Sequence, residues 1–413
     1  MSDPVVVIGG GIIGLSIAVR LRQRGAPVWL LDAAEPGMGA SWGNAGHLAV
    51  EQVYPVADAS MLPRLPAMLL DPLGPLRIDW RYLPRLAPWG WRALVNMLPA
   101  HAARSHRALL SINAHCLAAW LRLAKTWGLA PWIETRGTLQ CCETMQTERR
   151  LRALGQHLNT LGVENVWLDR RALQAREPAL AHGQRGALFY PGTGHVTDLR
   201  AISQGLLDAF LGLGGQLRTH CRVHRVEVTM GGIRLQTDQG EMRSARVVLA
   251  AGAFSKVLAR QLTGVSVPLD TERGYHLMLP NERGRLNLPV ASADRRFVMT
   301  PMAGGLRLAG TVEYAGLAAA PNMARAFNLR RLADGMLSEP LDETAAKPWM
   351  GFRPTTADSV PVIDRVGNVL LAFGHHHLGL TQAAATAEMI EALYFDEVSP
   401  VDTRPFRVAR FAR

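Results

Sequence analysis

Three glycines near the amino terminus have the spacing that binds a nucleotide diphosphate. Gly9, Gly11 and Gly14 form the pattern G-x-G-x-x-G directly after the β-branched run at residues 5–8. The first glycine permits a tight turn, the second lets the backbone approach a pyrophosphate, and the third lets a helix pack closely on a strand. The N–H groups at the start of that helix are unpaired, and the helix dipole favours an anion. We therefore expect these glycines to bind a dinucleotide.

The next predicted elements support this interpretation. Apolar residues at helical spacing follow the glycines, and a second apolar run at residues 28–31 ends in Asp32. An acid placed roughly 20 residues beyond the glycines can accept hydrogen bonds from the ribose hydroxyls of adenosine. Ile12, Ile13 and Ala33 are expected to contact the same cofactor. The motif by itself does not distinguish FAD from NAD.

A loop of small residues follows at residues 40–47. It carries Ser41, Asn44, Ala45, Gly46 and His47. Small side chains are needed where backbone lies close against a ligand. These residues are therefore expected to contact the ring system of the cofactor.

From this loop onward the sequence resembles the FAD-dependent D-amino acid oxidase and dehydrogenase superfamily. It is most similar to the small subunit of the D-amino acid dehydrogenases, in which a Ser-x-x-Asn-Ala-Gly loop approaches the flavin. The resemblance extends from about Val5 to about Leu393, and later segments match in the same order. These segments begin at Arg136, Glu177, Val247, Arg273, Pro301, Gly310, Trp349 and Gly374.

The resemblance implies FAD as the cofactor. No cysteine stands at the carboxyl-terminal positions where related enzymes tether their flavin, so we expect noncovalent binding. In the family, the start of a late helix faces the flavin pyrimidine ring, where its dipole stabilises negative charge. Here Thr381 is expected to cap that helix, over residues 382–394. Further cofactor contacts are expected at Val223, Ala251, Gly252, Gly379, Leu380 and Thr381.

The resemblance also implies a small amino-acid or imino-acid substrate. A carboxylate is held best by the planar fork of an arginine, and the family places such an arginine in a Gly-x-Arg-Pro segment, which here gives Arg353. Arg273 and Tyr275 are expected to form another wall of the pocket. His47 and Tyr54 are candidates for the amine side, and His376 is a further candidate.

The reaction implied is hydride transfer from the substrate Cα to flavin N5, followed by hydrolysis of the imino acid to a 2-oxo acid and ammonia. Electrons would pass to a quinone or another carrier, with oxygen left open as the acceptor. No acid or base is required when the amine arrives neutral. We therefore assign no catalytic proton shuttle from the sequence.

Other functions stay open at this point. One is a D-proline or hydroxy-D-proline dehydrogenase of the same fold, for which the sequence at residues 272–276 and the histidines at 375–377 would suit a cyclic substrate. A second is the flavin subunit of a hetero-oligomeric amine dehydrogenase. A third is a nicotinamide-dependent enzyme. Three consecutive histidines rarely converge on one ion, so no metal site is expected.

Composition narrows the class further. The chain has 413 residues, a net charge of +11, 48% hydrophobic and 19% charged residues, which exclude a disordered chain. No basic block interleaved with aromatic residues indicates nucleic-acid binding. The spacing of the four cysteines argues against disulfides, so we expect a cytoplasmic protein. Arginines and tryptophans within residues 61–100 indicate contact with the inner face of the cell membrane or, equally, a lid or subunit interface in an oligomer.

The expected fold is α/β, with an interleaved architecture. Residues 1–60, 195–267 and 346–395 are assigned to a Rossmann-like FAD-binding domain of the glutathione-reductase type. Residues 61–194 and 268–345 are assigned to a mostly antiparallel β substrate domain. Residues 396–413 are expected to form a peripheral tail.

Overall fold

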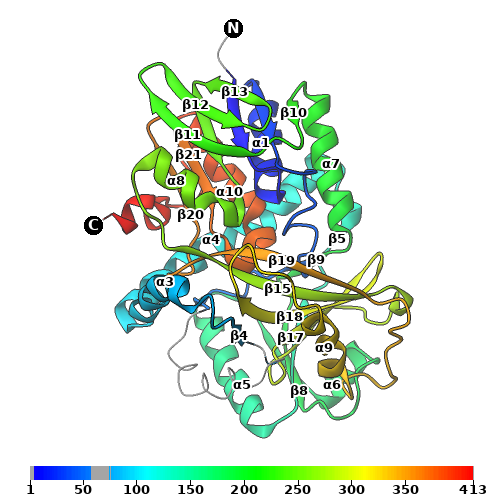
Figure 1. The fold of residues 1–413 in the computed structure, drawn as a ribbon. Helices are drawn as coiled ribbons and strands as arrows, with labels where there is room; N and C mark the ends of the chain where they lie inside the picture. Colours follow the sequence, from blue (N-terminus) through cyan, green and yellow to red (C-terminus); the bar gives the residue numbers. More distant parts are fainter. Residues whose placement is uncertain (1–3, 57–73, 75, 413) are drawn as a thin grey trace.

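A six-stranded sheet, mostly parallel, forms one half of the protein (Figure 1). The computed structural model describes residues 4–56, 74 and 76–412. Each neighbouring pair in this sheet is parallel except β20 with β21. In spatial order the strands are β10 (Gln216–Arg218), β2 (Val28–Leu31), β1 (Val5–Ile8), β14 (Arg246–Leu249), β21 (Val369–Phe373) and β20 (Val362–Val366).

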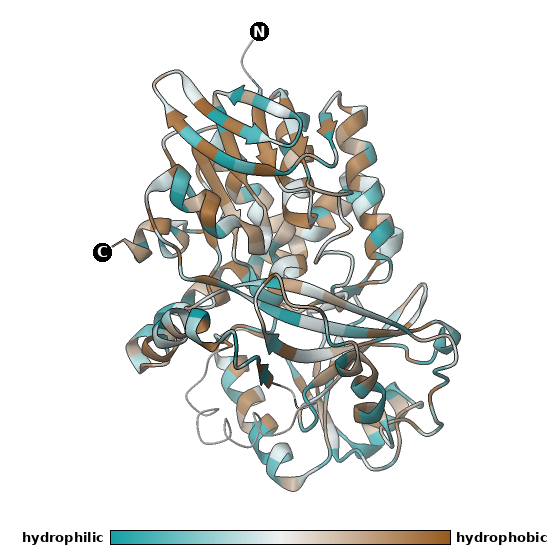
Figure 2. Cartoon of the chain, in the orientation of Figure 1, coloured by the Kyte–Doolittle hydropathy of each residue, from teal (hydrophilic) through white to brown (hydrophobic). Residues whose placement is uncertain are grey.

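Both faces of this sheet are covered, so its strands are continuously apolar, as parallel strands usually are. Figure 2 shows the hydrophobic residues concentrated on these strands. Four helices pack together on one side: α1 (Ile12–Gln23), α4 (Pro99–Thr126), α7 (Leu199–Gly212) and α10 (Gly379–Tyr394). The other side packs against α8 (Ser255–Thr263) and a three-stranded sheet of β11 (Val223–Thr229), β12 (Gly232–Thr237) and β13 (Gly240–Ser244).

A nine-stranded sheet forms the other half of the protein (Figure 1). Its pairs are antiparallel except β16 with β6 and β18 with β4. In spatial order the strands are β19 (Lys347–Thr356), β15 (Leu269–Leu279), β18 (Gly305–Tyr314), β17 (Phe297–Met302), β16 (Val290–Ser292), β6 (Thr138–Cys142), β8 (Gly186–Tyr190) and β7 (Val166–Asp169), with β4 (Leu76–Ile78) beside β18. The sheet is accompanied by α3 (Leu83–Asn96), α5 (Met145–Thr160), α6 (Arg170–Arg176) and α9 (Ala324–Ala333).

A short three-stranded sheet joins three distant segments. β3 (His47–Leu48) and β5 (Ile133–Glu134) both pair with β9 (Gly194–Val196). This pairing fixes the end of the loop of small residues, because His47 lies opposite His195.

The α/β fold class is confirmed, but two segments differ from the predicted division. Helix α4 lies within the predicted substrate segment, yet it packs against α10 and shares the core of the six-stranded sheet. Strand β19 lies within the predicted FAD-binding segment, yet it pairs along its length with β15 of the large sheet. Long apolar helices and strands of this kind fit either core on sequence alone.

The prediction of a peripheral tail is wrong. Phe406 is 0% exposed within the core shared by α1, α4 and α10, and Val408 packs on the opposite face of the same sheet. The Val408 N–H donates to Asp364 Oδ2 at 2.8 Å, and Arg410 Nε donates to Asp358 Oδ2 at 2.8 Å. The tail therefore belongs to the folded core.

Phe406→Ala is expected to lower the free energy of unfolding by about 3–5 kcal/mol, because it removes a fully buried ring and leaves a cavity. Val398→Ala is the matched control, since the Val398 side chain is 97% exposed. Thermal and denaturant unfolding of both variants measure the difference. Equal stability of the two variants would mean that the tail does not support the core.

Candidate active site

A cavity of about 1190 Å³ reaches from the carboxyl ends of β1, β2 and β14 to strands of the large sheet. Ligands of open α/β sheets bind at the carboxyl ends of the strands. Most small-molecule pockets measure roughly 300–1,000 Å³. This cavity is therefore large enough for a cofactor together with a substrate.

The glycine turn lies at the carboxyl end of β1. Gly9 has a φ of +105°, and a Cβ there would lie 2.5 Å from the Ala250 carbonyl oxygen. A Cβ on Gly14 would lie 1.8 Å from the Gly9 carbonyl oxygen. Only glycine fits either position: the backbone conformation and the close packing exclude a side chain at Gly9, and the close packing alone excludes one at Gly14. The turn thus leaves its backbone open toward the cavity.

Asp32 lies at the carboxyl end of β2 and also faces the cavity. Its Oδ2 accepts the Gly10 N–H at 2.6 Å, and its Oδ1 accepts the Ala34 N–H at 2.8 Å. Burial raises the pKa of this carboxyl, and the two backbone hydrogen bonds oppose that rise. A carboxylate oxygen has two acceptor sites, so Asp32 can hold the glycine turn and still accept a hydroxyl.

The loop of small residues is held from the large sheet. Arg307 Nη1 donates to the carbonyl oxygens of Trp42 at 3.0 Å and Asn44 at 2.6 Å. His276 Nδ1 lies 2.9 Å from the Gly43 carbonyl oxygen. Burial lowers the pKa of His276 to about 3 and that of Arg307 to about 10. The sequence analysis missed both supports, because they lie far along the chain and do not themselves have to touch a ligand.

Most of the predicted cofactor residues line the cavity. They are Gly9, Gly11, Ile12, Ile13, Asp32, Ala33, Ser41, Asn44, Ala45, His47, Val223, Ala251, Gly252, Gly379 and Leu380. Gly14 and Gly46 lie behind this lining. Their places are restricted by packing, since a Cβ on Gly46 would lie 2.8 Å from the Val196 carbonyl oxygen.

The predicted cap at Thr381 is wrong. Helix α10 begins at Gly379, three residues earlier than predicted, and its N-cap residue is Leu378. Thr381 therefore lies inside the first turn, where its Oγ1 accepts the Ala49 N–H at 2.9 Å. The side chain fixes the segment that follows the loop of small residues, and Gly379 and Leu380 present the helix start to the cavity.

These features fit FAD. The open glycine turn can receive a pyrophosphate, Asp32 can receive a ribose, and the small-residue loop leaves backbone facing the space where a flat ring would lie. The start of α10 adds a positive helix dipole at the same cavity. Bound FAD would supply a hydride acceptor there.

Arg353 presents a partly buried cation to the cavity. It lies on β19 opposite Glu272 of β15, and a Cβ on Gly274 would lie 2.4 Å from its Cζ. Gly274 therefore leaves the space that the guanidinium occupies. Burial lowers the pKa of Arg353, and the charge of Glu272 opposes that change. A buried guanidinium is well suited to bind a carboxylate.

Glu272 links Arg353 to a histidine. Its Oε1 accepts the Tyr314 hydroxyl at 2.6 Å and lies 3.2 Å from His376 Nε2. Burial acts to raise the pKa of Glu272, but His376, Tyr314 and Arg353 together hold it at about 2. His376 lines the cavity. The carboxylate therefore offsets the charge of Arg353 and fixes His376 beside it.

The prediction that Arg273 forms a wall of the pocket is wrong. Arg273 is 0% exposed, and its guanidinium donates to the carbonyl oxygens of Gly316 at 2.8 Å and Ala320 at 3.1 Å. The Arg273 side chain therefore holds the loop at Gly316 and Ala320 and does not line the cavity. Tyr275 does line the cavity, with its hydroxyl donating to Glu313 Oε2 at 2.5 Å.

The predicted amine-side residues also line the cavity. His47 Nε2 lies 3.0 Å from Thr138 Oγ1, and burial lowers the pKa of His47 to about 4. Tyr54 stacks on His106 with ring centroids 4.4 Å apart. Both side chains are uncharged near neutral pH.

The sequence analysis missed Glu51, which lines the same cavity. Burial raises its pKa to about 7. The sequence does show an acid shortly after the loop of small residues, three residues beyond the short strand His47–Leu48. That position could have identified Glu51 as a candidate.

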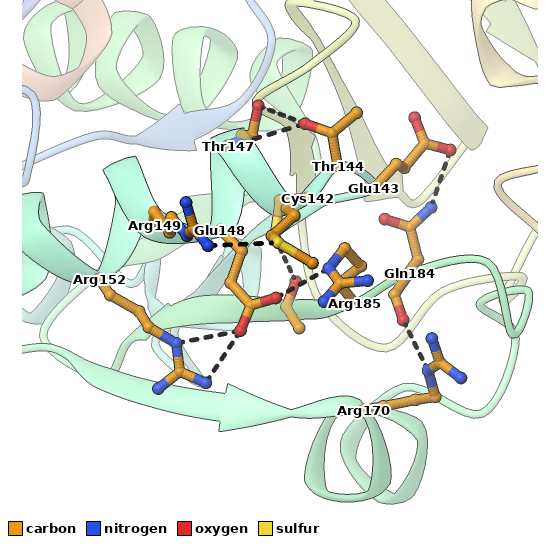
Figure 3. Close-up of polar contacts among 12 residues, drawn as sticks. Cys142, Glu143, Thr144, Thr147, Glu148, Arg149, Arg152, Arg170, Gln184 and Arg185 are labelled. Atoms are coloured by element: carbon orange, nitrogen blue, oxygen red, sulfur yellow. Dashed lines mark hydrogen bonds and ion pairs between the residues drawn. The ribbon is translucent and has the colours of Figure 1, made fainter.

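Helix α5 contributes Leu154 and Leu158 to the cavity. Figure 3 shows how its first turns are held: Glu148 accepts from Arg185 at 2.8 Å and from Arg152 at 3.1 Å. The Thr144 hydroxyl accepts the Thr147 N–H at 3.2 Å and caps the helix. These contacts fix the helix against β8, so its two leucines form an apolar wall.

The FAD dependent oxidoreductase family, DAO, matches residues 4–393. The chain belongs to this family. A D-amino-acid oxidase of Bradyrhizobium diazoefficiens is 33% identical over 98% of each chain. A D-amino acid dehydrogenase of Paramagnetospirillum magneticum is 28% identical over 98% of each chain.

Solved structures share the fold of this FAD-dependent family member. Glycine oxidase from Geobacillus kaustophilus superposes with a TM-score of 0.74 at 21% identity, covering 99% of each chain. L-proline dehydrogenase from P. horikoshii superposes with a TM-score of 0.75 at 16% identity, covering 99% of this chain and 98% of its own. The FAD-dependent fold predicted from sequence is confirmed.

Gly14→Ala is expected to reduce FAD retention by roughly 10- to 100-fold, because the new methyl group would displace the Gly9 turn at an overpacking cost of about 1–3 kcal/mol. The flavin-to-protein absorbance ratio after gel filtration measures this. Gly183→Ala is the control, since nothing lies within 4 Å of a Cβ there. Full flavin content in both variants would contradict the role of the turn.

Proposed function

We propose that this enzyme catalyses the oxidative deamination of D-amino acids and passes the electrons to a membrane quinone. The observation that carries the proposal is the partly buried guanidinium of Arg353 at the cavity that the loop of small residues also lines. A carboxylate held there brings the neighbouring Cα to the same space. Positioning of this kind can supply much of the rate enhancement.

The protein residues bind, orient and shield the substrate. Arg353 binds the substrate carboxylate, and Glu272, which lies opposite it on the adjacent strand, offsets the charge of its guanidinium. Leu154, Leu158 and the ring of Tyr54 accept the substrate side chain and exclude water. Bound FAD supplies the hydride acceptor. The product imino acid is then hydrolysed to a 2-oxo acid and ammonia.

The names of the relatives support a D-configured substrate. The Bradyrhizobium diazoefficiens relative is a D-amino-acid oxidase, and the Paramagnetospirillum magneticum relative is a D-amino acid dehydrogenase. One name implies oxygen as the acceptor and the other does not. The acceptor is therefore tested together with the substrate.

An exposed apolar surface on and around α3 supports the proposal that a membrane quinone is the electron acceptor. Trp80 is 58%, Trp91 68%, Leu94 45% and Leu98 54% exposed. The basic residues Arg81 and Arg85 lie exposed in the same segment. Tryptophan beside arginine on an amphipathic helix suits anionic lipid headgroups. Within the part of the chain that the structure describes, no helix has the length and apolar character to cross a bilayer.

We expect D-amino acids, and not their L-enantiomers, to bleach the flavin under anaerobic conditions. The panel includes D-proline, which bleaches the flavin fastest if the substrate is cyclic.

Arg353→Lys is expected to raise KM by roughly 10- to 100-fold at unchanged flavin content, since losing a charged hydrogen bond costs about 1.5–3 kcal/mol. Arg136→Lys, at an exposed pair with Glu134, is the control. No bleaching by any amine would overturn the proposed function.

The α3 surface is expected to bind vesicles that contain phosphatidylglycerol, and less so vesicles of phosphatidylcholine alone. Trp91→Ser with Arg85→Gln should reduce co-sedimentation at least threefold, because both apolar burial and charge attraction are weakened. Met230→Ser, at a fully exposed hydrophobic residue outside α3, is the control. Equal sedimentation of all variants, with peroxide formed in place of reduced quinone, would contradict the membrane acceptor.

A further inference from the structure

Glu51 is a buried acid whose charge has no partner. It follows strand β3 and lines the same cavity as Arg353. Its side chain is only 9% exposed, and its Oε2 has no hydrogen-bond partner among the described residues. Leaving a buried charge uncompensated is costly, so a ligand that brings a positive charge to this oxygen would relieve that cost.

The groups that face Glu51 do not supply that charge. His47, from β3, holds its Nε2 3.7 Å from Glu51 Oε2, but burial keeps the pKa of His47 near 4, so the ring is neutral at pH 7. Tyr190, from β8, donates its hydroxyl to Gln140 Oε1 at 3.0 Å. Burial and the nearby charge of Glu51 raise the pKa of Tyr190. Burial accordingly raises the pKa of Glu51 to about 7.

The segment that carries Glu51 also contacts the histidines beside Arg353. The neighbouring residue, Gln52, forms a hydrogen bond with His377 Nε2. The charge of Arg353 and the ring of His47 both lower the pKa of His377, in addition to burial. His377 is therefore close to both groups, which brings the segment of Glu51 and the guanidinium of Arg353 to one part of the cavity.

We propose that Glu51 binds the ammonium group of the substrate and accepts its proton before Cα is oxidised. This inference rests on the proposed function. An α-amino acid arrives as a zwitterion, so its carboxylate meets Arg353 while its ammonium meets Glu51. The ligand then supplies the cation that Glu51 lacks.

The proton transfer prepares the nitrogen for oxidation. An N–H bond of the ammonium breaks, an O–H bond forms at Glu51, and the nitrogen keeps the electron pair. Bound FAD would supply the hydride acceptor, so that loss of hydride from Cα of the neutral amine would leave a protonated imine. A carboxyl with a pKa near the working pH is well matched to accept a proton.

The pair of opposite charges also determines the substrate class. A 2-hydroxy acid has the same carboxylate but no positive charge, and its hydroxyl does not release a proton near neutral pH. Sites that recognise a polar group strongly reject an analogue that leaves that site unpaired. Primary and secondary α-amines are therefore accepted, and 2-hydroxy acids are rejected.

Glu51→Gln is expected to lower kcat/KM for anaerobic flavin reduction by about 100-fold or more, which is typical for loss of a general base. In the unmodified enzyme, kcat/KM should rise with pH through about 7, because only the ionised carboxylate accepts the proton. This rise of kcat/KM with pH should be absent in Glu51→Gln and present in Glu51→Asp. Glu339→Gln is the matched control, at a side chain that is 75% exposed.

A second measurement separates amine recognition from a structural role. Propionate, which has the carboxylate of D-alanine but no amine, is titrated against the flavin absorbance of the holoenzyme. Its Kd should be unchanged or lower in Glu51→Gln, since the variant removes a negative charge. A Kd raised as much as KM for D-alanine would overturn the proposal.

The outcomes also distinguish this inference from the function on which it rests. If D-amino acids bleach the flavin and Glu51→Gln keeps the pH profile, only the role of Glu51 is wrong. If the loss is confined to substrates with cationic side chains, Glu51 binds the side chain and the proposal is overturned. If no amine bleaches the flavin of the unmodified enzyme, both proposals fail.

Discussion

Arg353 is a partly buried cation at the wall of the cavity, and the need to compensate its charge organises the substrate half of the protein. A buried guanidinium is stable only when nearby groups compensate its charge and hydrogen-bonding capacity. Glu272 provides the compensation from the adjacent strand, and the charge of Arg353 helps to keep the pKa of Glu272 at about 2. Gly274 provides the space. The pair is nearly neutral overall, yet the guanidinium still presents donors to the cavity.

The loop of small residues is held by contacts from both halves of the protein, so the two halves must be built together. Arg307 and His276 of the large sheet hold the loop that begins in the FAD-binding half, at Trp42, Gly43 and Asn44. Thr381 of α10 holds the segment that follows it. The loop therefore has little freedom before a cofactor binds, which lowers the entropy lost on binding. Pre-organisation of the flavin-contacting loop comes from residues that do not themselves need to touch the flavin.

Local patterns in the sequence were sufficient for the cofactor end of the cavity. Gly9, Gly11 and Asp32 occupy their places because two strands with one turn and one helix between them dictate those places. The substrate end depends on which face of a strand each residue occupies, and the sequence could not separate Arg273 from Arg353 on that basis. Both lie in matching segments, but Arg273 bonds to the loop at Gly316 and Ala320. A change of one residue in register reverses the face of every side chain.

Glu51 escaped notice for a related reason. Its burial follows from the pairing of β3 with β9 and from the position of β8, which are contacts between residues far apart in the chain. Only those contacts turn an ordinary acid into a carboxyl with a pKa near 7. His47 and His375 stay neutral at pH 7, because burial lowers the pKa of His47 to about 4 and that of His375 to about 3. Arg353 and Glu51 both line the cavity, together with the neutral ring of His47. A cation and an acid in one cavity match a zwitterion better than a simple anion, and this complementarity argues for an amino acid rather than a hydroxy acid as the substrate.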